Sequence, residues 1–389
     1  MSTFLVSPAG ATDVHAAASD AGDLAVVWER GGAVEMAYSP ADVGFGTRVV
    51  VSAADSSDPR AAYDASGRLL VVWTSAKGGE PPRLMSRVMT DTGTWAAPVQ
   101  IATRPGGTIR VADVAVNASG QAVVGWLWRD RALVTRGALG GSWSTGAPWR
   151  KTLSVDVAIG DGGHAAAMLQ GWVGPLADEA TLTFAVARQS PAGVWGATKI
   201  LQTVVQDPPW VGPGGVAVDA QGVTTVAWQR FSGTGTTVVA RRARPGRAFG
   251  APVVLAGQPT RSESPVRVLA TPDGLVQVAW VHDWIAGVRA VRRPVGGPWS
   301  APAVVCGGDG VVVGWDVALA DTGQGLAAVS RAAHFGTQGT RTSVTNRAGR
   351  WLTPDQVSTI ADGPQVAIST NWAVVTWLTP KGVRVTVNE

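Results

Sequence analysis

The chain has 389 residues, of which 49 are glycine and only 15% are charged, and its formal net charge is +4. The basic residues are spread along the chain, which argues against a nucleic-acid footprint, because such a footprint needs a clustered basic face. No segment reaches the ~18 continuous apolar residues of a membrane span, residues 1–10 lack the regions of a signal peptide, and a single cysteine, Cys306, excludes an internal disulfide.

Paired apolar alternations recur along the chain, and each pair is joined at a turn residue. Residues 216–228, Val-Ala-Val-Asp-Ala-Gln-Gly-Val-Thr-Thr-Val-Ala-Trp, are the clearest example and predict two antiparallel strands. The turn residues of the eight copies are Gly22, Gly67, Gly120, Gly163, Gly222, Gly274, Gly323 and Asn371. Six residues after each stands a large apolar residue: Trp28, Trp73, Trp126, Leu169, Trp228, Trp280, Val329 and Trp377.

A third and a fourth strand follow each pair. In seven copies, an aromatic residue after a small turn marks the start of the fourth strand: Phe45, Trp95, Trp143, Trp195, Phe249, Trp299 and Trp351. The eighth copy ends after its third strand, and residues 4–8, Phe-Leu-Val-Ser-Pro, fit the missing one. The pattern predicts an all-β fold: an eight-bladed β-propeller of four-stranded antiparallel blades, whose last blade is closed by the N-terminal strand.

We expect one domain over residues 1–389, with no linker or second domain. The predicted blades span approximately residues 12–54, 58–103, 109–152, 154–203, 213–257, 265–306, 314–360, and 364–389 together with 2–8. Alanine at the centre of the first strands lets eight strands crowd round one axis, and most tryptophans are expected to pack between blades.

The Val-Ala-Val-Asp…Gly…Trp and Gly-x-Trp-Ser-Ala-Pro patterns resemble the repeats of the sialidase-like, BNR-type bacterial β-propellers over the whole chain. The resemblance implies the fold and says little about activity. The Asp-box of that family, Ser-x-Asp-x-Gly-x-Thr-Trp, is not present in full. Sialidases of the family are six-bladed and use a tyrosine nucleophile with a glutamate and three arginines. This chain has only Tyr38 and Tyr63, and neither aligns with such a site.

The residue that opens each first strand is predicted to ring one mouth of the central channel. Aligning the copies on the turn residue selects His15, Arg60, Asp113, Asp156, Gly215, Arg267, Asp316 and Gln365. We call these eight positions the collar. Arginine can grip a carboxylate in a bidentate fork, so a sugar or an acidic ligand is the expected partner. The alternative is a solvated channel mouth whose charges neutralise one another.

The loops after the second strands are predicted to reach the same face. They carry Arg30, Trp128, Trp172, Arg230, His282, Trp284, Arg331 and His334 as further candidate ligand-binding residues. His15, His282 and His334 fall in copies 1, 6 and 7, and with Asp113, Asp156 and Asp316 they are the candidate acid and base groups if the protein is an enzyme. No short His-x-His spacing exists, so the histidines are poor candidates for metal ligands. No other cofactor is expected.

Three functions remain open at this stage. The first is a non-catalytic, lectin-like recognition propeller that binds a glycan or an acidic ligand at the channel mouth. The second is a carbohydrate-active enzyme, a glycoside hydrolase or polysaccharide lyase. The third is a structural or receptor-binding component of a phage tail or injection system. Action outside the cell or on a virion would suit all three, although the sequence names no compartment.

Overall fold

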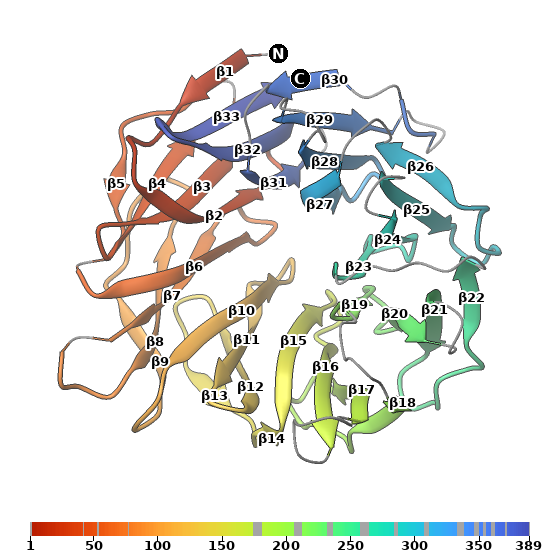
Figure 1. Ribbon diagram of the computed structural model, residues 1–389. Coiled ribbons are helices and arrows are strands. Elements are labelled where there is room, and N and C mark those ends of the chain that lie inside the picture. The colour runs from red at the N-terminus through yellow and green to blue at the C-terminus, as the bar shows by residue number, and fades with distance from the viewer. Residues whose placement is uncertain are drawn as a thin grey trace.

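The computed structural model describes residues 2–388 except 42, 53, 77, 174–180, 206–211, 232–235, 257–263, 284–286, 307–310, 333–337, 346–349, 353–354, 359–361 and 370–371. All named elements of this described part are strands, and they form eight sheets. Figure 1 shows the sheets arranged around a central axis, with the N- and C-termini side by side. The prediction of an eight-bladed β-propeller is confirmed.

The first four blades follow the chain in order, with the first strand of each blade innermost. Blade 1 contains β2 (Ala11–Ala18), β3 (Leu24–Arg30), β4 (Ala33–Ser39) and β5 (Val49–Val50). Blade 2 contains β6 (Ser56–Tyr63), β7 (Leu69–Ser75), β8 (Arg83–Met89) and β9 (Val99–Thr103). Blade 3 contains β10 (Ile109–Val116), β11 (Gln121–Trp128), β12 (Arg131–Ala138), β13 (Trp143–Thr145) and β14 (Trp149–Arg150). Blade 4 contains β15 (Thr152–Ile159), β16 (Ala165–Val173), β17 (Thr181–Gln189) and β18 (Lys199–Val205).

The last four blades repeat this order, and the eighth joins the two ends of the chain. Blade 5 contains β19 (Gly215–Val218), β20 (Thr224–Phe231), β21 (Thr236–Ala243) and β22 (Val253–Ala256). Blade 6 contains β23 (Arg267–Ala270), β24 (Val276–Asp283), β25 (Gly287–Arg293) and β26 (Ala303–Cys306). Blade 7 contains β27 (Val311–Leu319), β28 (Gly325–Ala332), β29 (Gln338–Val344) and β30 (Asp355–Ser358). Blade 8 contains β31 (Asp362–Ile368), β32 (Ala373–Thr379), β33 (Gly382–Asn388) and β1 (Ser2–Leu5).

The N-terminal strand closes the ring, as the repeat predicts. β1 pairs antiparallel with β33, from Ser2 opposite Val387 to Leu5 opposite Arg384, and Figure 1 shows it at the outer edge of blade 8. The hydroxyls of Thr3 and Thr386 are 2.9 Å apart. This pairing satisfies the backbone edge that β33 would otherwise expose.

The core lies between the blades, where one blade's second strand meets its neighbour. Trp28, Trp126, Trp228, Trp280 and Trp377 are each at most 2% exposed. In one cluster, Trp228 of blade 5 packs with Phe184 of blade 4, and their rings lie 6.4 Å apart. The tryptophans therefore act mainly as packing groups, and large aromatic area is what the wide outer part of a wedge requires.

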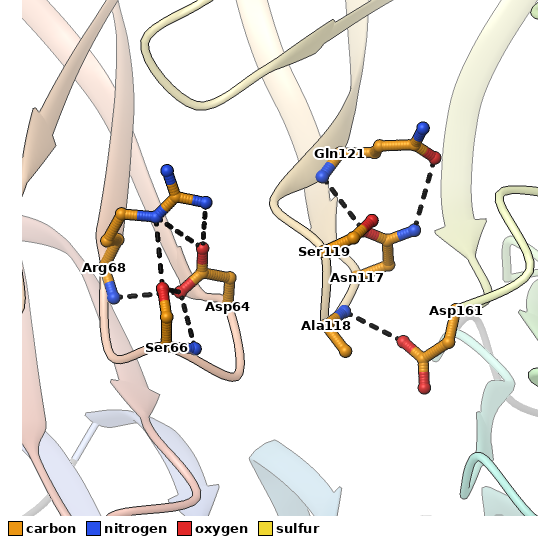
Figure 2. A network of polar contacts seen from close by, with 8 residues as sticks. All are labelled: Asp64, Ser66, Arg68, Asn117, Ala118, Ser119, Gln121 and Asp161. Atoms are coloured by element: carbon orange, nitrogen blue, oxygen red, sulfur yellow. Dashed lines mark hydrogen bonds and ion pairs between the residues drawn. The ribbon is translucent and has the colours of Figure 1, made fainter.

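Turns at the face opposite the collar tie neighbouring blades together. At one of them, Gly222 has a φ of 76°, and a Cβ there would collide with the imidazole of His164 from blade 4. Figure 2 shows two further turns, in blades 2 and 3. The side-chain amide of Asn117 donates to the carbonyl of Gly160 at 3.1 Å. The N–H of Ala118 donates to Asp161 at 2.8 Å, as Figure 2 also shows.

Arginines of the third strands form a second set of ties between blades. Arg136 of β12 donates to the side chain of Gln189 at 2.9 Å, Arg188 of β17 to the carbonyl of Arg247 at 2.7 Å, and Arg292 of β25 to that of Gly323 at 2.9 Å. In each case the acceptor belongs to the following blade. These arginines hold the ring together and do not form a basic binding face.

Candidate functional site

Seven collar side chains line one cavity at the axis of the propeller. The cavity has a volume of about 630 Å³, and its lining includes His15, Arg60, Asp113, Asp156, Arg267, Asp316 and Gln365. The eighth position, Gly215, contributes no side chain. The expectation that each collar residue opens its strand is wrong for six of the eight, because only Gly215 and Arg267 begin their strands. The collar residues converge because each lies on the innermost strand, opposite the residue that precedes Trp28 or its equivalent on the second strand.

Four collar side chains accept a backbone hydrogen bond from the next blade. The N–H donors are Ala61 to His15 Nδ1 at 3.4 Å, Val157 to Asp113 Oδ2 at 2.9 Å, Val216 to Asp156 Oδ2 at 2.8 Å, and Val366 to Asp316 Oδ2 at 3.1 Å. Each donor directly follows the collar position of its own blade. The collar thus joins neighbouring innermost strands, a structural role that the sequence did not reveal.

Two guanidinium groups share the cavity with these acceptors. Arg267 Nε lies 3.9 Å from Asp316 Oδ1, and the Arg267 side chain is 39% exposed. Arg60 donates to the carbonyl of Pro59 at 2.8 Å. Burial lowers the pKa of Arg60, against the attraction of Asp113. Both groups remain cationic at neutral pH, since guanidinium does not deprotonate in proteins.

Burial sets the protonation of the other collar groups. It raises the pKa of Asp113 and of Asp316, and Arg267 opposes both shifts. Burial, and then repulsion by Asp113, raises the pKa of Asp156 well above its usual value. Both shifts are upward, so the pair retains a proton to higher pH than isolated carboxyls do.

His15 is a neutral member of the collar. Burial, followed by the charges of Arg60 and Arg267, lowers the pKa of His15 to about 3. Neutral imidazole matches its role as acceptor for the Ala61 N–H. Its second ring nitrogen is then a hydrogen-bond donor within the cavity that His15 lines.

Five candidates that were predicted in loops after the second strands lie in the last residues of those strands and do not join the collar. Arg30, Trp128, Trp172, Arg230 and His282 are absent from the cavity lining. Arg30 forms an ion pair with Glu35 at 2.9 Å, and His282 is buried at 7% exposure.

Trp128 has local partners as well, so its position has a packing explanation. Its Nε1 donates to the carbonyl of Gly106 at 2.7 Å, and the guanidinium groups of Arg129 and Arg131 lie 5.1 and 5.2 Å from its ring. Three further candidates are not placed. Trp284 and His334 lie outside the described residues, and only the strand position of Arg331 is described.

The opposite mouth of the channel holds an acidic group that the sequence did not single out. A smaller cavity of about 210 Å³ there is lined by Asp20, Asp161 and Asp321 among others. Burial, and then the charges of Asp20, Asp161 and Asp273, raises the pKa of Asp321 to about 6. These aspartates stand in or beside the hairpin turns, where an acidic residue is usual, so no pattern marked them.

Neither a metal-binding cluster nor a membrane-spanning helix occurs in the part of the chain that the structure describes. No group of three or more His, Cys, Asp or Glu side chains is arranged to hold a metal ion. No helix there is long and apolar enough to span a membrane.

The comparisons with known proteins identify structural neighbours and no family. No family model matches the sequence, and no curated protein sequence matches it. A Dyadobacter fermentans protein of unknown function is 13% identical, with 86% of this chain and 94% of that chain covered and a TM-score of 0.45.

Bacterial sialidases are among the other neighbours. A Hadza microbial sialidase is 13% identical over 96% of this chain and 74% of its own, with a TM-score of 0.40. A Streptococcus pneumoniae sialidase is 9% identical over 95% of this chain and 84% of its own, with a TM-score of 0.42. A eukaryotic initiation factor is similar over 99% of this chain, at 10% identity and a TM-score of 0.47.

Proposed function

We propose that this protein is a recognition propeller that binds an acidic sugar, or a glycan carrying one, at the collar. The observation that supports this most is the convergence of Arg60 and Arg267 with hydroxyl-binding groups in one cavity of about 630 Å³. That volume falls within the range of small-molecule sites.

The collar offers complementary groups for each part of such a ligand. The two guanidinium groups can hold a carboxylate through charge-assisted hydrogen bonds. Asp156, Gln365 and the second nitrogen of His15 can exchange hydrogen bonds with sugar hydroxyls. A neutral sugar would leave the cations without a new partner, so we expect preference for acidic sugars.

The hydrogen bonds of the collar favour binding over catalysis. Both carboxylate oxygens of Asp113 accept backbone N–H groups, from Val114 and Val157, at 2.9 Å each. Asp156 and Asp316 each hold the next blade as well. Carboxyls that fix neighbouring strands are poorly placed to move during a reaction, which supports non-catalytic recognition.

Calorimetry tests this function after a glycan array has selected the ligand. Arg60→Gln and Arg267→Gln should each weaken binding of an acidic sugar by about tenfold or more, since charge-assisted hydrogen bonds contribute about 1.5–3 kcal/mol. Arg150→Gln is the control, because Arg150 is exposed on β14 and outside the cavity. Equal affinity in all four proteins, or no ligand in a broad panel of acidic glycans, would reject the proposal.

One observation favours a carbohydrate-active enzyme as a second candidate. The Asp113–Asp156 pair retains a proton, because burial and Asp113 raise the pKa of Asp156, and a protonated carboxyl can act as a general acid. Under this alternative, cleavage of a polysaccharide is lost in Asp156→Asn while binding is kept. Activity that survives Asp156→Asn combined with Asp316→Asn would eliminate these residues as its acid and base.

A further inference from the structure

A second cavity lies away from the collar, between blades 7 and 8. Its volume is about 740 Å³. Gln356, Val357 and Ser358 of β30 form one side. Blade 8 forms the other side with Thr3 of β1 and with Trp377, Thr379, Pro380, Lys381 and Arg384. We call it the closure cleft, because both chain ends contribute to it.

A buried indole in this cleft has an unused donor. Trp377 is 1% exposed, and its Nε1 has no hydrogen-bond partner among the described residues. Two equivalent tryptophans are satisfied, since Trp28 Nε1 donates to Glu35 and Trp126 Nε1 to Thr135, both at 2.9 Å. Trp280 Nε1 shares the lack of a partner among the described residues. A buried N–H without a partner costs about 1–3 kcal/mol, so its presence calls for an explanation.

One equivalent tryptophan donates toward the preceding blade. In blade 5, Trp228 Nε1 donates at 2.6 Å to Gln202 of β18, the outer strand of the preceding blade. Gln202 pairs with Phe184 immediately before a bulge, and Ser358 of β30 pairs with Thr340 immediately before the same bulge in blade 7. Ser358 therefore stands where blade 4 has Gln202, and its side chain is too short to fill the same place. The closure cleft opens at this position, beside Trp377.

The charge of the cleft is positive. Arg384 is half-buried and pairs with Trp377 across β32 and β33, and Lys381 is exposed in the turn between them. No carboxyl group occurs among the described lining residues. An indole N–H, a guanidinium and an ammonium form a set of donors without a matching anion.

We propose that the closure cleft is a second binding site, for a small ligand that carries an oxyanion. The oxyanion accepts from Trp377 Nε1 and from Arg384, and Lys381 adds a long-range attraction. Carboxylate and phosphate share this chemistry. Because β30 belongs to blade 7 and Thr3 to the closing strand, a bound ligand joins the two blades and stabilises the closed ring.

Indole NMR tests the proposal at the donor itself. The ¹H–¹⁵N signal of Trp377 is identified by its loss in Trp377→Phe, and then inorganic phosphate and glucuronate are titrated separately at constant ionic strength. We expect a saturable shift of this signal with at least one probe, and the two titrations distinguish a phosphate from a carboxylate site. No shift with either probe would overturn the proposal.

Variants separate this site from the collar. Arg384→Gln should weaken the binding seen at the Trp377 signal by about tenfold, and Lys381→Gln, at an exposed position, should weaken it less. Arg267→Gln and Trp280→Phe should leave it unchanged, the latter because Trp280 is also a buried tryptophan with an unpartnered Nε1. If the titration of the Trp377 signal gives the same affinity in Arg384→Gln as in the wild-type protein, Arg384 does not bind the oxyanion. Failure here leaves collar binding, measured with the Arg60 and Arg267 variants, untouched.

Discussion

At the scale of single residues, the collar shows one position performing two tasks. His15, Asp113, Asp156 and Asp316 each accept a backbone N–H from the next blade and also line the axial cavity. The acceptor side chains bind the backbone of the next blade. Arg60 and Arg267, at the same position in other blades, supply hydrogen-bond donors for a ligand. An acidic or neutral acceptor at this position is therefore no evidence of catalysis by itself.

The protonation of His15 gives a first prediction. Burial and the two arginines lower the pKa of His15 to about 3, against about 6.5 in the unfolded chain. The native state binds fewer protons between pH 3 and 6.5, so the contribution of His15 to stability increases as the pH rises through that window. Histidine NMR should find the ring neutral at pH 5. Wild-type protein should also lose more stability than His15→Gln between pH 6.5 and 5, and a ring that is charged at pH 5 would contradict the burial argument.

For Asp321, at the opposite mouth of the channel, the pH dependence of stability has the opposite sign. Burial and neighbouring aspartates raise the pKa of Asp321 to about 6, so the native state binds more protons than the unfolded chain between pH 4 and 6. Its contribution to stability therefore falls as the pH rises through that window. Asp321→Asn should raise the melting temperature at pH 7.5, by an amount that corresponds to about 1 kcal/mol once solvent screening is allowed for, and should have little effect below pH 4. Asp130→Asn, at an exposed loop position, is the control. A variant that melts lower than wild type at pH 7.5 would disprove the repulsion.

At the scale of strands and blades, regular features were predictable and contacts between blades were not. The hairpin turns, the tryptophans six residues later and the collar positions depend on local spacing, which the sequence displays. The partners of Asp113 and Arg136 lie in other blades, and they depend on how closely the sheets approach. Arg30 and Trp128 were expected in loops near the collar, but they are the last residues of β3 and β11 and have local partners.

The buried tryptophans give a prediction at this scale. Trp126 Nε1 donates to Thr135, whereas Trp280 Nε1 has no partner among the described residues. Replacing each by phenylalanine removes the same atoms, but only Trp126→Phe removes a hydrogen bond. We expect Trp126→Phe to lower the free energy of unfolding by about 1 kcal/mol more than Trp280→Phe. Urea denaturation measures the free energy of unfolding of both variants. Equal decreases would show that the hydrogen bond of Trp126 makes no net contribution to stability.

At the scale of the whole molecule, closure determines the collar. Counting repeats predicted that the last blade needs a strand from the N-terminus, and β1 occupies that place beside β33. With eight blades in one ring, the collar residues occupy equivalent places around one axis, and seven of their side chains line one cavity. Counting repeats could not predict the chemistry of the closure cleft, because that depends on Ser358 of blade 7 standing where blade 4 has the longer Gln202.

A disulfide across the seam tests this closure most directly. Thr3 and Thr386 pair across β1 and β33 with their hydroxyls 2.9 Å apart, so cysteines at both positions are close enough to be bridged. In a Cys306→Ser background, Thr3→Cys with Thr386→Cys should oxidise to an intramolecular disulfide and melt at a higher temperature than its reduced form. If the two cysteines stay reduced under oxidising conditions, or if the oxidised and reduced forms melt together, the first strand does not close the ring, and the collar loses its basis.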